Sequence, residues 1–356
     1  MALFPNQNHT GQLADRQLLI RMINGGLITQ LIHVAAQLGI ADVLAEGAQT
    51  SEELARRVGA HPHALYRVLR ALASLGVLAE TPEGRFEMTA LALPLQTNAP
   101  ESLRALAIMW GETFWQPYGE LLQSVRTGEV AFTHVHGMGL FDYLQHHPQA
   151  GEIFHAAMTN LTRPHAAAVL AAYDFTDILT VVDVGGGNGT LVAAILHAYP
   201  QMRGVLFEQA DVLASARQTL ENAGVLSRCA LESGDFFQEL PRGGDAYLLK
   251  DIIHDWEDAR AIAILENCRR DMGERSKVLL IERAMPVGNA PAPGKLIDIT
   301  MLTITGGLER TEVEYRDLLA RAGLRLNRVL PTASEMIVIE GVPALRRDNE
   351  GQRRDS

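Results

Sequence analysis

From residue 179 onward, short apolar segments alternate with longer segments of helical periodicity, and this alternation restricts the fold more than any other feature of the chain. It is typical of an α/β fold, a mostly parallel sheet covered by helices on both faces. Only "PTAS" separates the last two apolar segments. Because that is too short for a helical crossover, we expect these two strands to pair antiparallel at one edge. The seven predicted strands are 179–184, 204–208, 229–235, 246–250, 277–283, 325–331 and 335–340.

A glycine-rich turn, "VVDVGGGNGT", follows the first of these strands and opens a helix. In this context glycines let the backbone approach a ligand at the carboxyl edge of a sheet. The dinucleotide pattern G-x-G-x-x-G is met at Gly185 and Gly187, but its third position is Thr190, and the glycine lies one residue earlier, at Gly189. This departure disfavours a dinucleotide, and a turn that binds no ligand is the alternative.

The next two strands also end in groups suited to a nucleoside. Glu208 ends "GVLFE", where an acid can accept hydrogen bonds from the two hydroxyls of a ribose. In "SGDFF", Asp235 can accept from an adenine amino group and Phe236 can stack on the ring. Each feature alone has an ordinary structural explanation, a solvated strand end or a core phenylalanine. Three successive strand ends with ligand-suited groups together predict a nucleoside site.

The chain before this sheet, residues 11 to about 175, is predicted to be mainly helical. Within it, a capped helix from Ser51, a helix opened by Pro62 and a hairpin turning at 82–84 predict a winged helix. Winged helices often bind DNA. Residues 50–90, however, contain five arginines and five glutamates, so their formal charge is zero, and we favour a structural or dimer-forming module.

Composition restricts the partners and the surroundings of the protein. The 356 residues are 47% hydrophobic, enough for a large core and two domains, and the net charge of -11 argues against nucleic acid or an anionic membrane as the main partner. The two cysteines have neither metal-ligand nor disulfide spacing, and no secretory leader or long apolar run is evident. We expect a cytoplasmic protein with domains at 1–175 and 176–345 and a disordered charged tail at 346–356.

Five motifs carry a resemblance to a known family: "VVDVGGGNG", "GDFF", "LLKDIIHDWED", "VLLIERAMP" and "GGLERT", in this order. Together they resemble the class I S-adenosylmethionine-dependent O-methyltransferases of the plant caffeate and bacterial antibiotic-tailoring type, over nearly the whole chain. The resemblance implies a Rossmann-like catalytic domain, S-adenosylmethionine as cofactor and a homodimer formed through the N-terminal domain. It also implies that the cofactor is bound by Asp183, Gly185, Gly187, Gly189, Glu208, Asp235, Phe236 and Lys250.

The histidine in "LLKDIIHDWED" is the candidate base. His254 follows a strand that ends at Lys250, and Glu282 ends the neighbouring strand, so both are expected at the ligand-binding edge of the sheet. Imidazole suits general-base work at neutral pH, and a carboxylate can fix its tautomer. A histidine here can also simply cap or pack. The resemblance implies that His254 is the base, with Glu282 and Glu309 as its supporting acids.

The pKa gap between acceptor and base bears on the substrate. Moving a proton from a phenol of pKa about 10 to an imidazole of about 6.5 costs roughly 5 kcal/mol. From an unactivated hydroxyl, near the ~15.7 of water, it costs about 12 kcal/mol. A phenolic or enolic hydroxyl of an aromatic small molecule is therefore the expected acceptor. Because opposite charges cancel when a phenolate attacks a sulfonium, alignment should dominate the transfer, and no metal is required.

A flat acceptor also needs an apolar pocket. Two of the three tryptophans fall within "LAIMWGETFWQPY", although most such residues in any protein are core. By resemblance, Trp115, Met158 and Met301 are expected to contact the acceptor, with Asp255 beside the base. Two other functions stay open: N-methylation or hydroxylation on the same scaffold, and a winged-helix regulator that senses a ligand.

Overall fold

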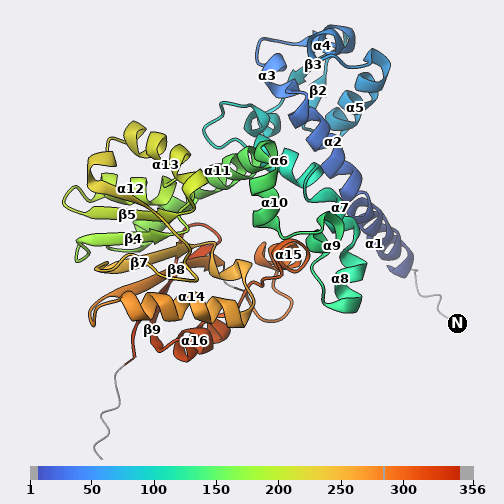
Figure 1. Ribbon diagram of the computed structural model, residues 1–356. Helices are drawn as coiled ribbons and strands as arrows, with labels where there is room; N and C mark the ends of the chain where they lie inside the picture. Colours follow the sequence, from blue (N-terminus) through green and yellow to red (C-terminus); the bar gives the residue numbers. More distant parts are fainter. Residues whose placement is uncertain (1–6, 284, 345–356) are drawn as a thin grey trace, which may run out of the picture. The chain divides into compact units, whose positions relative to one another are not determined.

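The chain forms two compact units. The computed structural model describes residues 7–283 and 285–344, so the predicted disordered tail lies outside the described residues. The first unit contains Met1–Trp115 and Pro148–Asn160, and the second contains Gln116–His147 and Leu161–Ser356 (Figure 1). This division differs from the single boundary predicted at residue 175, because the helix α11 contributes to both units.

The first unit is mainly helical, with a small three-stranded sheet in the order β1-β3-β2. Its elements are α1 (Gln7–Ile23), α2 (Gly25–Gln37), α3 (Ile40–Leu44), β1 (Gln49–Thr50), α4 (Ser51–Val58), α5 (Pro62–Ser74), β2 (Leu78–Glu80), β3 (Arg85–Met88), η1 (Ala90–Leu95), α6 (Arg104–Gly111) and the first half of α11 (Pro148–Ala172). Within the described residues no single helix has the length and apolar composition to cross a membrane, although the pair Ala14–Ile23 and Gly25–Gln37, bent by 44°, meets both conditions together.

Local sequence explains the predicted helix pair and hairpin of this unit. Thr50 accepts a hydrogen bond from the amide of Glu53, whose carboxylate accepts one from the amide of Thr50 at 2.8 Å, so a capping box starts α4. Pro62 opens α5, where its fixed φ favours a helix start. Strands β2 and β3 pair antiparallel around Gly84, which has a φ of 73°. The predicted helix starts and hairpin are confirmed.

The second unit contains the predicted seven-stranded sheet. Its elements are α8 (Leu121–Thr127), α9 (Ala131–His136), α10 (Leu140–His146), the second half of α11, β4 (Thr180–Val184), α12 (Thr190–Ala198), β5 (Arg203–Glu208), α13 (Ala210–Asn222), η2 (Leu226–Arg228), β6 (Cys229–Ser233), β7 (Ala246–Lys250), η3 (Ile253–Asp255), α14 (Asp258–Asp271), β8 (Lys277–Arg283), α15 (Gly294–Thr300), η4 (Met301–Thr305), α16 (Glu312–Arg321), β9 (Leu324–Pro331) and β10 (Met336–Pro343). A further short helix, α7 (Trp115–Gly119), spans the unit boundary.

The strand order is β6-β5-β4-β7-β8-β10-β9. The pairs β6–β5, β5–β4, β4–β7 and β7–β8 are parallel, whereas β10 runs antiparallel to both β8 and β9. The predicted antiparallel pair is confirmed. The last strand of the chain nevertheless lies inside the sheet, between β8 and β9, a position that the length of the "PTAS" turn does not reveal.

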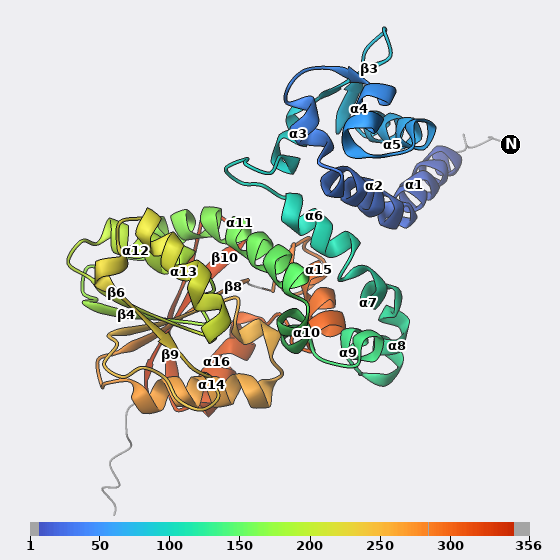
Figure 2. The same ribbon diagram turned by 45° about the horizontal axis from the view of Figure 1, so that its top comes forward.

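Helices cover both faces of this sheet, with α12 and α13 on one face and α14 and α16 on the other (Figure 2). The strands are buried on both sides, so their alternate residues enter two different cores. Val181 packs with Leu191 and Ile195 of α12, whereas its neighbour Val182 packs in the core that contains Ile264 of α14. This double burial explains the nearly continuous apolar runs in the sequence.

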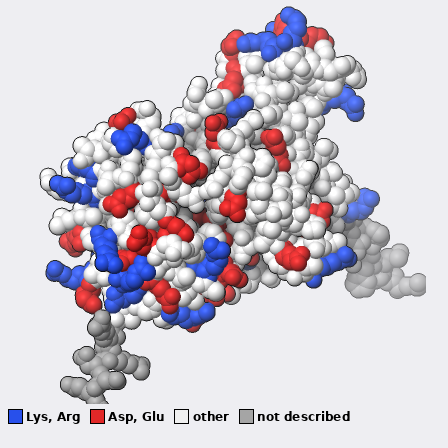
Figure 3. Space-filling view, in the orientation of Figure 1, with Lys and Arg blue, Asp and Glu red and all other residues white. Residues whose placement is uncertain are grey.

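The parallel strands all point their carboxyl ends to the same edge of the sheet. There β4 is followed by the glycine turn, β5 ends at Glu208, and Asp235 follows β6. Strand β7 ends at Lys250, and the last two residues of β8 are Glu282 and Arg283. On the face shown in Figure 3, acidic and basic side chains are interspersed over this unit.

Candidate active site

The imidazole of His254 is held by a carboxylate. His254 lies in the short helix η3, is 6% exposed, and its Nδ1 lies 2.8 Å from Oε1 of Glu309. Because a carboxylate only accepts, Nδ1 carries the proton and donates it to this bond. In the neutral ring the lone pair is therefore on Nε2, which is the atom available to take a proton.

Two more acids face the same ring. Oε2 of Glu282 lies 3.8 Å from Nδ1 of His254, and Oδ1 of Asp255 lies 3.8 Å from Nε2. The other oxygen of Glu282 accepts a hydrogen bond of 2.9 Å from the amide of Ile253, which ties the end of β8 to η3. The structure thus brings together His254, Glu282 and Glu309, as predicted, and places Asp255 on the side of the ring where a proton would arrive.

These contacts change the proton affinity of the cluster. Burial alone would lower the pKa of His254, but the carboxylates of Glu282 and Asp255 and the hydrogen bond to Glu309 outweigh burial and raise that pKa to about 10. Burial also raises the pKa of Glu282, and raises that of Asp255 to about 6. The ligand-free cluster therefore binds protons more tightly at neutral pH than the isolated groups would.

The turn at Gly306 and Gly307 delivers Glu309 to the histidine. It follows a π-helical turn, η4, and Gly306 has a φ of 81°. A Cβ on Gly307 would lie 1.9 Å from the carbonyl oxygen of His254, so only glycine allows this approach. One residue later, the amide of Leu308 donates to the same carbonyl at 2.9 Å. The glycine pair of "GGLERT" is therefore part of the site, which the sequence alone did not indicate.

The buried side chain of Arg310 also holds the segment of His254 against the segment of Glu309. Its guanidinium, in a residue that is 1% exposed, donates to the carbonyl oxygens of Ile253 at 3.1 Å and Trp256 at 2.8 Å and pairs with Asp258 at 2.9 Å. These bonds clamp the segment that carries His254 to the segment that carries Glu309.

Asp251 and Arg283 are a further part of the site that sequence reasoning missed. Asp251 accepts a hydrogen bond of 2.7 Å from Nη1 of Arg283 and pairs through its other oxygen with Lys250. By distance alone, Asp251, His254 and Glu282 could share a cation, because their ligand atoms lie within 4.8 Å of one another. Both oxygens of Asp251 already face cations, however, and Nδ1 of His254 faces Glu309. This donor set is that of an ion-pair network.

The glycine turn and Glu208 interlock at the end of β5. Oε2 of Glu208 accepts from the amide of Gly187 at 2.9 Å, and Oε1 accepts from the amide of Gln209 at 2.7 Å. Gly185, with a φ of 65°, lies close to the side chains of Ile252 and Phe236, where a Cβ would meet Cδ1 of Ile252 at 2.6 Å. The carboxylate is thereby held at the edge where a ribose was predicted.

A pocket of about 450 Å³ lies next to Glu208, at the ends of β5 and β6. Asp235, Gly234, Asp211 and Gln209 line it, together with Gln145 from α10, which donates to Gln209 at 2.7 Å. One oxygen of Asp235 accepts from the amide of Phe237, so the side chain is fixed in place. The side chains of Asp211, Asp235, Gln145 and Gln209 supply hydrogen-bond acceptors and donors to this pocket.

Asp183 lies below the glycine turn and is 1% exposed. Its Oδ2 makes no hydrogen bond within the described residues, and burial together with the charge of Glu208 raises its pKa to about 7. A buried oxygen of this kind calls for a donor from a ligand or a bound proton. Together, the turn, the held Glu208 and the pocket at Asp235 fit a nucleoside cofactor with an amino-acid end.

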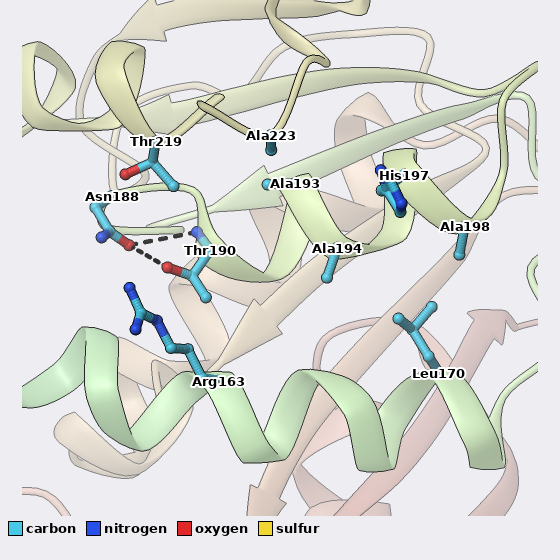
Figure 4. A pocket seen from close by; sticks show the side chains of 10 residues that line it. All are labelled: Arg163, Leu170, Asn188, Thr190, Ala193, Ala194, His197, Ala198, Thr219 and Ala223. Atoms are coloured by element: carbon cyan, nitrogen blue, oxygen red, sulfur yellow. Dashed lines mark hydrogen bonds between the residues drawn. The ribbon is translucent and has the colours of Figure 1, made fainter. Parts of the chain in front are cut away.

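A second groove, of about 420 Å³, lies between α11, α12 and α13 (Figure 4). Figure 4 shows Arg163 pointing toward Asn188 and Thr190 at the start of α12. Oδ1 of Asn188 accepts from Oγ1 of Thr190 at 2.8 Å and from the amide of the same residue at 3.3 Å, just before α12 begins. The rest of the lining is largely small and apolar, and the groove contains none of the predicted site residues.

The predicted acceptor contacts are divided between the units. Met301, 7% exposed, opens the π-helical turn, and Trp256 stacks on Phe141 of α10 with ring centroids 5.8 Å apart. Trp115 and Met158 belong to the first unit. Their roles as acceptor contacts stay predictions.

Comparisons with known proteins point to one family. The family model described as the O-methyltransferase domain matches residues 118–325, and that of the O-methyltransferase dimerisation domain matches residues 20–97. The phenazine O-methyltransferase PhzM of Lysobacter antibioticus is 44% identical over 336 residues, covering 94% of this chain and 98% of its own length.

Solved structures give the same result. The crystal structure of LaPhzM superposes with a TM-score of 0.90 at 44% identity, covering 92% of this chain and 99% of that chain. NcsB1, an O-methyltransferase solved with S-adenosylmethionine and 2-hydroxy-5-methyl naphthoic acid, has a TM-score of 0.78 at 30% identity, covering 89% and 96%. The chain therefore belongs to the S-adenosylmethionine-dependent O-methyltransferase family.

Proposed function

We propose that this enzyme transfers the methyl group of S-adenosylmethionine to a phenolic or enolic hydroxyl of an aromatic secondary metabolite, with His254 as the general base. The observation that carries the proposal is the bond between Nδ1 of His254 and Glu309, which leaves the proton-accepting Nε2 on the opposite side of the ring, the side of Asp255. A base so oriented can take the hydroxyl proton as the oxygen attacks.

The raised pKa of His254 determines both the cost of the proton transfer and the pH at which the proposed base is neutral. An imidazole with a pKa of about 10 matches a phenol of about 10, so the proton transfer itself is nearly free of cost. The ring must first lose its proton to solvent, however, and this loss becomes easier as the pH rises. Glu282, Asp255 and Glu309 stabilise the imidazolium that forms once the hydroxyl proton has moved.

The donor site is proposed to use the residues at the ends of β4 to β7. Glu208 would bind the ribose hydroxyls, Asp235 and Phe236 the adenine, and Asp183, Lys250 and the glycine turn at 185–189 the methionine end. S-adenosylmethionine, when bound, supplies a methyl group on a positively charged sulfur. The chain's part is to hold donor and acceptor in line, since alignment dominates such transfers.

For the acceptor we propose a fused-ring phenol, held by Trp115, Met158 and Met301. Two observations support this class: the relative with 44% identity is named for a phenazine, and NcsB1 was solved with a naphthoic acid. Trp256 lies two residues after the proposed base, stacks on Phe141 and has the guanidinium of Arg260 4.3 Å from the centre of its ring, so an aromatic cluster adjoins the segment that carries His254.

We further propose a homodimer through the N-terminal domain, residues 1–175, with residues 176–345 as the catalytic domain. The matched dimerisation model supports it, as do the exposed apolar side chains of α1 and α2, namely Leu18, Leu19, Met22, Ile23 and Leu27. Light scattering should give a mass near twice 38.9 kDa.

The test is methyl transfer to a panel of acceptors. We expect mass spectrometry to detect the addition of one labelled methyl group to a hydroxyphenazine or hydroxynaphthoate, and much less to an aliphatic alcohol of similar size. His254→Ala should abolish most of this transfer, while His63→Ala, at an exposed position on α5, should not change it. Transfer that His254→Ala does not reduce would contradict the proposed base.

N-methylation is the second candidate. Two relatives are named for it: the phenazine-1-carboxylate N-methyltransferase of Pseudomonas aeruginosa, 33% identical over 341 residues, and an 8-amino-8-demethylriboflavin N,N-dimethyltransferase, 35% identical over 313 residues. Aminophenazines and phenazine-1-carboxylate in the same panel distinguish the two reactions, because a methyl group on nitrogen survives treatments that cleave an aryl methyl ether.

A further inference from the structure

Asp251 has an unusual backbone conformation for its type. Among the described residues it is the one non-glycine residue with a positive φ, 52°, and it lies directly after β7. Its amide donates to the carbonyl of Ile281 on the neighbouring strand at 3.1 Å. A residue with a side chain keeps a positive φ only where contacts with its surroundings impose this backbone conformation, and such residues cluster at functional sites.

The carboxylate of Asp251 joins two cations. One oxygen accepts from Nη1 of Arg283 at 2.7 Å, and the other pairs with Nζ of Lys250. Arg283 is buried and Lys250 is partly buried, with 9% and 10% of their side-chain surfaces exposed. The left-handed backbone at residue 251 is what turns this carboxylate back between the ends of β7 and β8.

Arg283 is also close to the acid that holds the base. Its Nη1 lies 3.8 Å from Oε1 of Glu309, the same oxygen that contacts Nδ1 of His254 at 2.8 Å. Two cationic groups thus face one carboxylate oxygen. The imidazole has the direct bond, and the guanidinium is bonded to Asp251 instead.

We propose that Asp251 is a positioning residue for methyl transfer, whose carboxylate holds Arg283 back from Glu309 and so leaves Glu309 to orient the imidazole of His254. The inference rests on the proposed role of His254 as the base. Without this carboxylate, Arg283 needs to close only about 1 Å to form a direct ion pair with Glu309, the distance at which an arginine fork binds a carboxylate.

Other charged and titratable groups surround this network and are left unchanged in the test. They are His165 of α11, Asp183 of β4, Asp255 of η3, Glu282 of β8, Asp298 of α15, Arg310 after the glycine turn, Tyr315 of α16 and Glu335 before β10.

The test compares Asp251→Asn with Asp251→Gly. Asparagine and glycine both accept a positive φ, and both lack the charge that holds Arg283. We expect each variant to lower the pKa of His254 by about one unit, because Arg283 moves toward Glu309 and weakens its hold on the ring. The readouts are the pH at which kcat/KM rises, which should move to lower pH, and the titration of the imidazole by nuclear magnetic resonance. Asp317→Asn, which breaks an exposed pair with Arg321 on α16, is the matched control and should change neither.

Arg283→Met separates an effect through Arg283 from a direct effect of the charge on Asp251. This variant should raise the pKa of His254, and adding Asp251→Asn to it should produce little further shift. A full additive shift in the double variant would overturn the proposal. The proposal is also overturned if the Asp251 variants have a lower kcat but the pKa of His254 is unchanged, because Asp251 would then have only a structural role.

A crystal structure of Asp251→Asn decides the question even if Arg283→Met does not fold. We expect Arg283 within about 3.2 Å of Glu309, and an unmoved guanidinium contradicts the inference. Failure of the proposed function gives a different result. If His254→Ala transfers methyl groups normally, His254 is not the base. The imidazole titration and the position of Arg283 still show in that case whether Asp251 acts on His254 through Arg283 and Glu309.

Discussion

Gly307 lies so close to His254 that any side chain at position 307 would overlap the carbonyl oxygen of the histidine. The built Cβ would be 1.9 Å from that oxygen and 2.4 Å from the carbonyl carbon of Asp255. These neighbours are backbone atoms, which cannot turn aside. The approach of two loops, one bearing the base and the other bearing Glu309, therefore depends on the absence of a side chain.

Gly307→Ala should separate the two loops. We expect kcat to fall by at least tenfold and the free energy of unfolding to drop by about 1–3 kcal/mol, as for other overpacked sites. Gly119→Ala is the control, because nothing lies within 4 Å of its Cβ position and its φ is not positive. Chemical denaturation and steady-state kinetics measure both effects, and a fully active Gly307→Ala enzyme would refute the close approach.

Removing the groups around the base should have graded effects. His254→Ala should lower kcat by about 10²–10⁴-fold, the usual contribution of a general base. Glu309→Gln keeps an oxygen near Nδ1 but loses the charge-assisted bond, so a decrease of about 10- to 100-fold is expected. Single-turnover rates at saturating donor measure both. Equal activity in Glu309→Gln and the parent enzyme would mean that Glu309 does not orient the ring.

The pH dependence should be alkaline. The pKa of His254 is raised to about 10, and a base acts only in its neutral form, so kcat/KM should rise about tenfold per pH unit between pH 7 and 9. In Glu309→Gln the loss of one carboxylate should move this rise to lower pH. A profile that levels off near pH 6.5, the value of an unperturbed histidine, would contradict the raised pKa.

Asp183 should make the ligand-free protein less stable as the pH rises. Its pKa is about 7 in the folded state against 3.8 in the unfolded chain, so the folded state binds the proton more tightly. The resulting stabilisation is complete below pH 3.8 and is lost as the pH rises through 7. Asp183→Asn lacks this loss. The free energy of unfolding of Asp183→Asn minus that of the parent protein should therefore increase by at most about 4 kcal/mol from pH 4 to pH 8. Denaturant titration measures this difference. A constant difference would show that Asp183 is ionised in the folded protein.

Glu208→Gln should weaken cofactor binding. The amide oxygen can still accept from Gly187, but the side chain loses the charge that strengthens hydrogen bonds to hydroxyl groups, so the Kd of S-adenosylhomocysteine should rise about 10- to 100-fold. Calorimetry measures the affinity. Glu232→Gln, exposed on β6, should bind normally. Unchanged affinity in Glu208→Gln would remove Glu208 from the ribose site.

The sequence by itself determined the sheet and identified most of the residues of the candidate site. Apolar runs at 179–184 and 246–250 predicted β4 and β7, because strands buried on both faces are nearly continuous apolar segments. His254 follows such a strand, and the family resemblance of its motif identified it as the candidate base. Strand ends and glycine turns are local features, so they can be recognised in one dimension.

Only the tertiary structure decided which groups meet. The insertion of β10 between β8 and β9, the approach of Gly307 to His254 and the capture of Arg283 by Asp251 join segments that are far apart in sequence or whose side-chain directions depend on the backbone. The pKa of a buried imidazole likewise depends on charges from three separate segments. Such properties are set by distances in space, because electrostatic and steric interactions depend on the separation of groups in space and not on their separation along the chain.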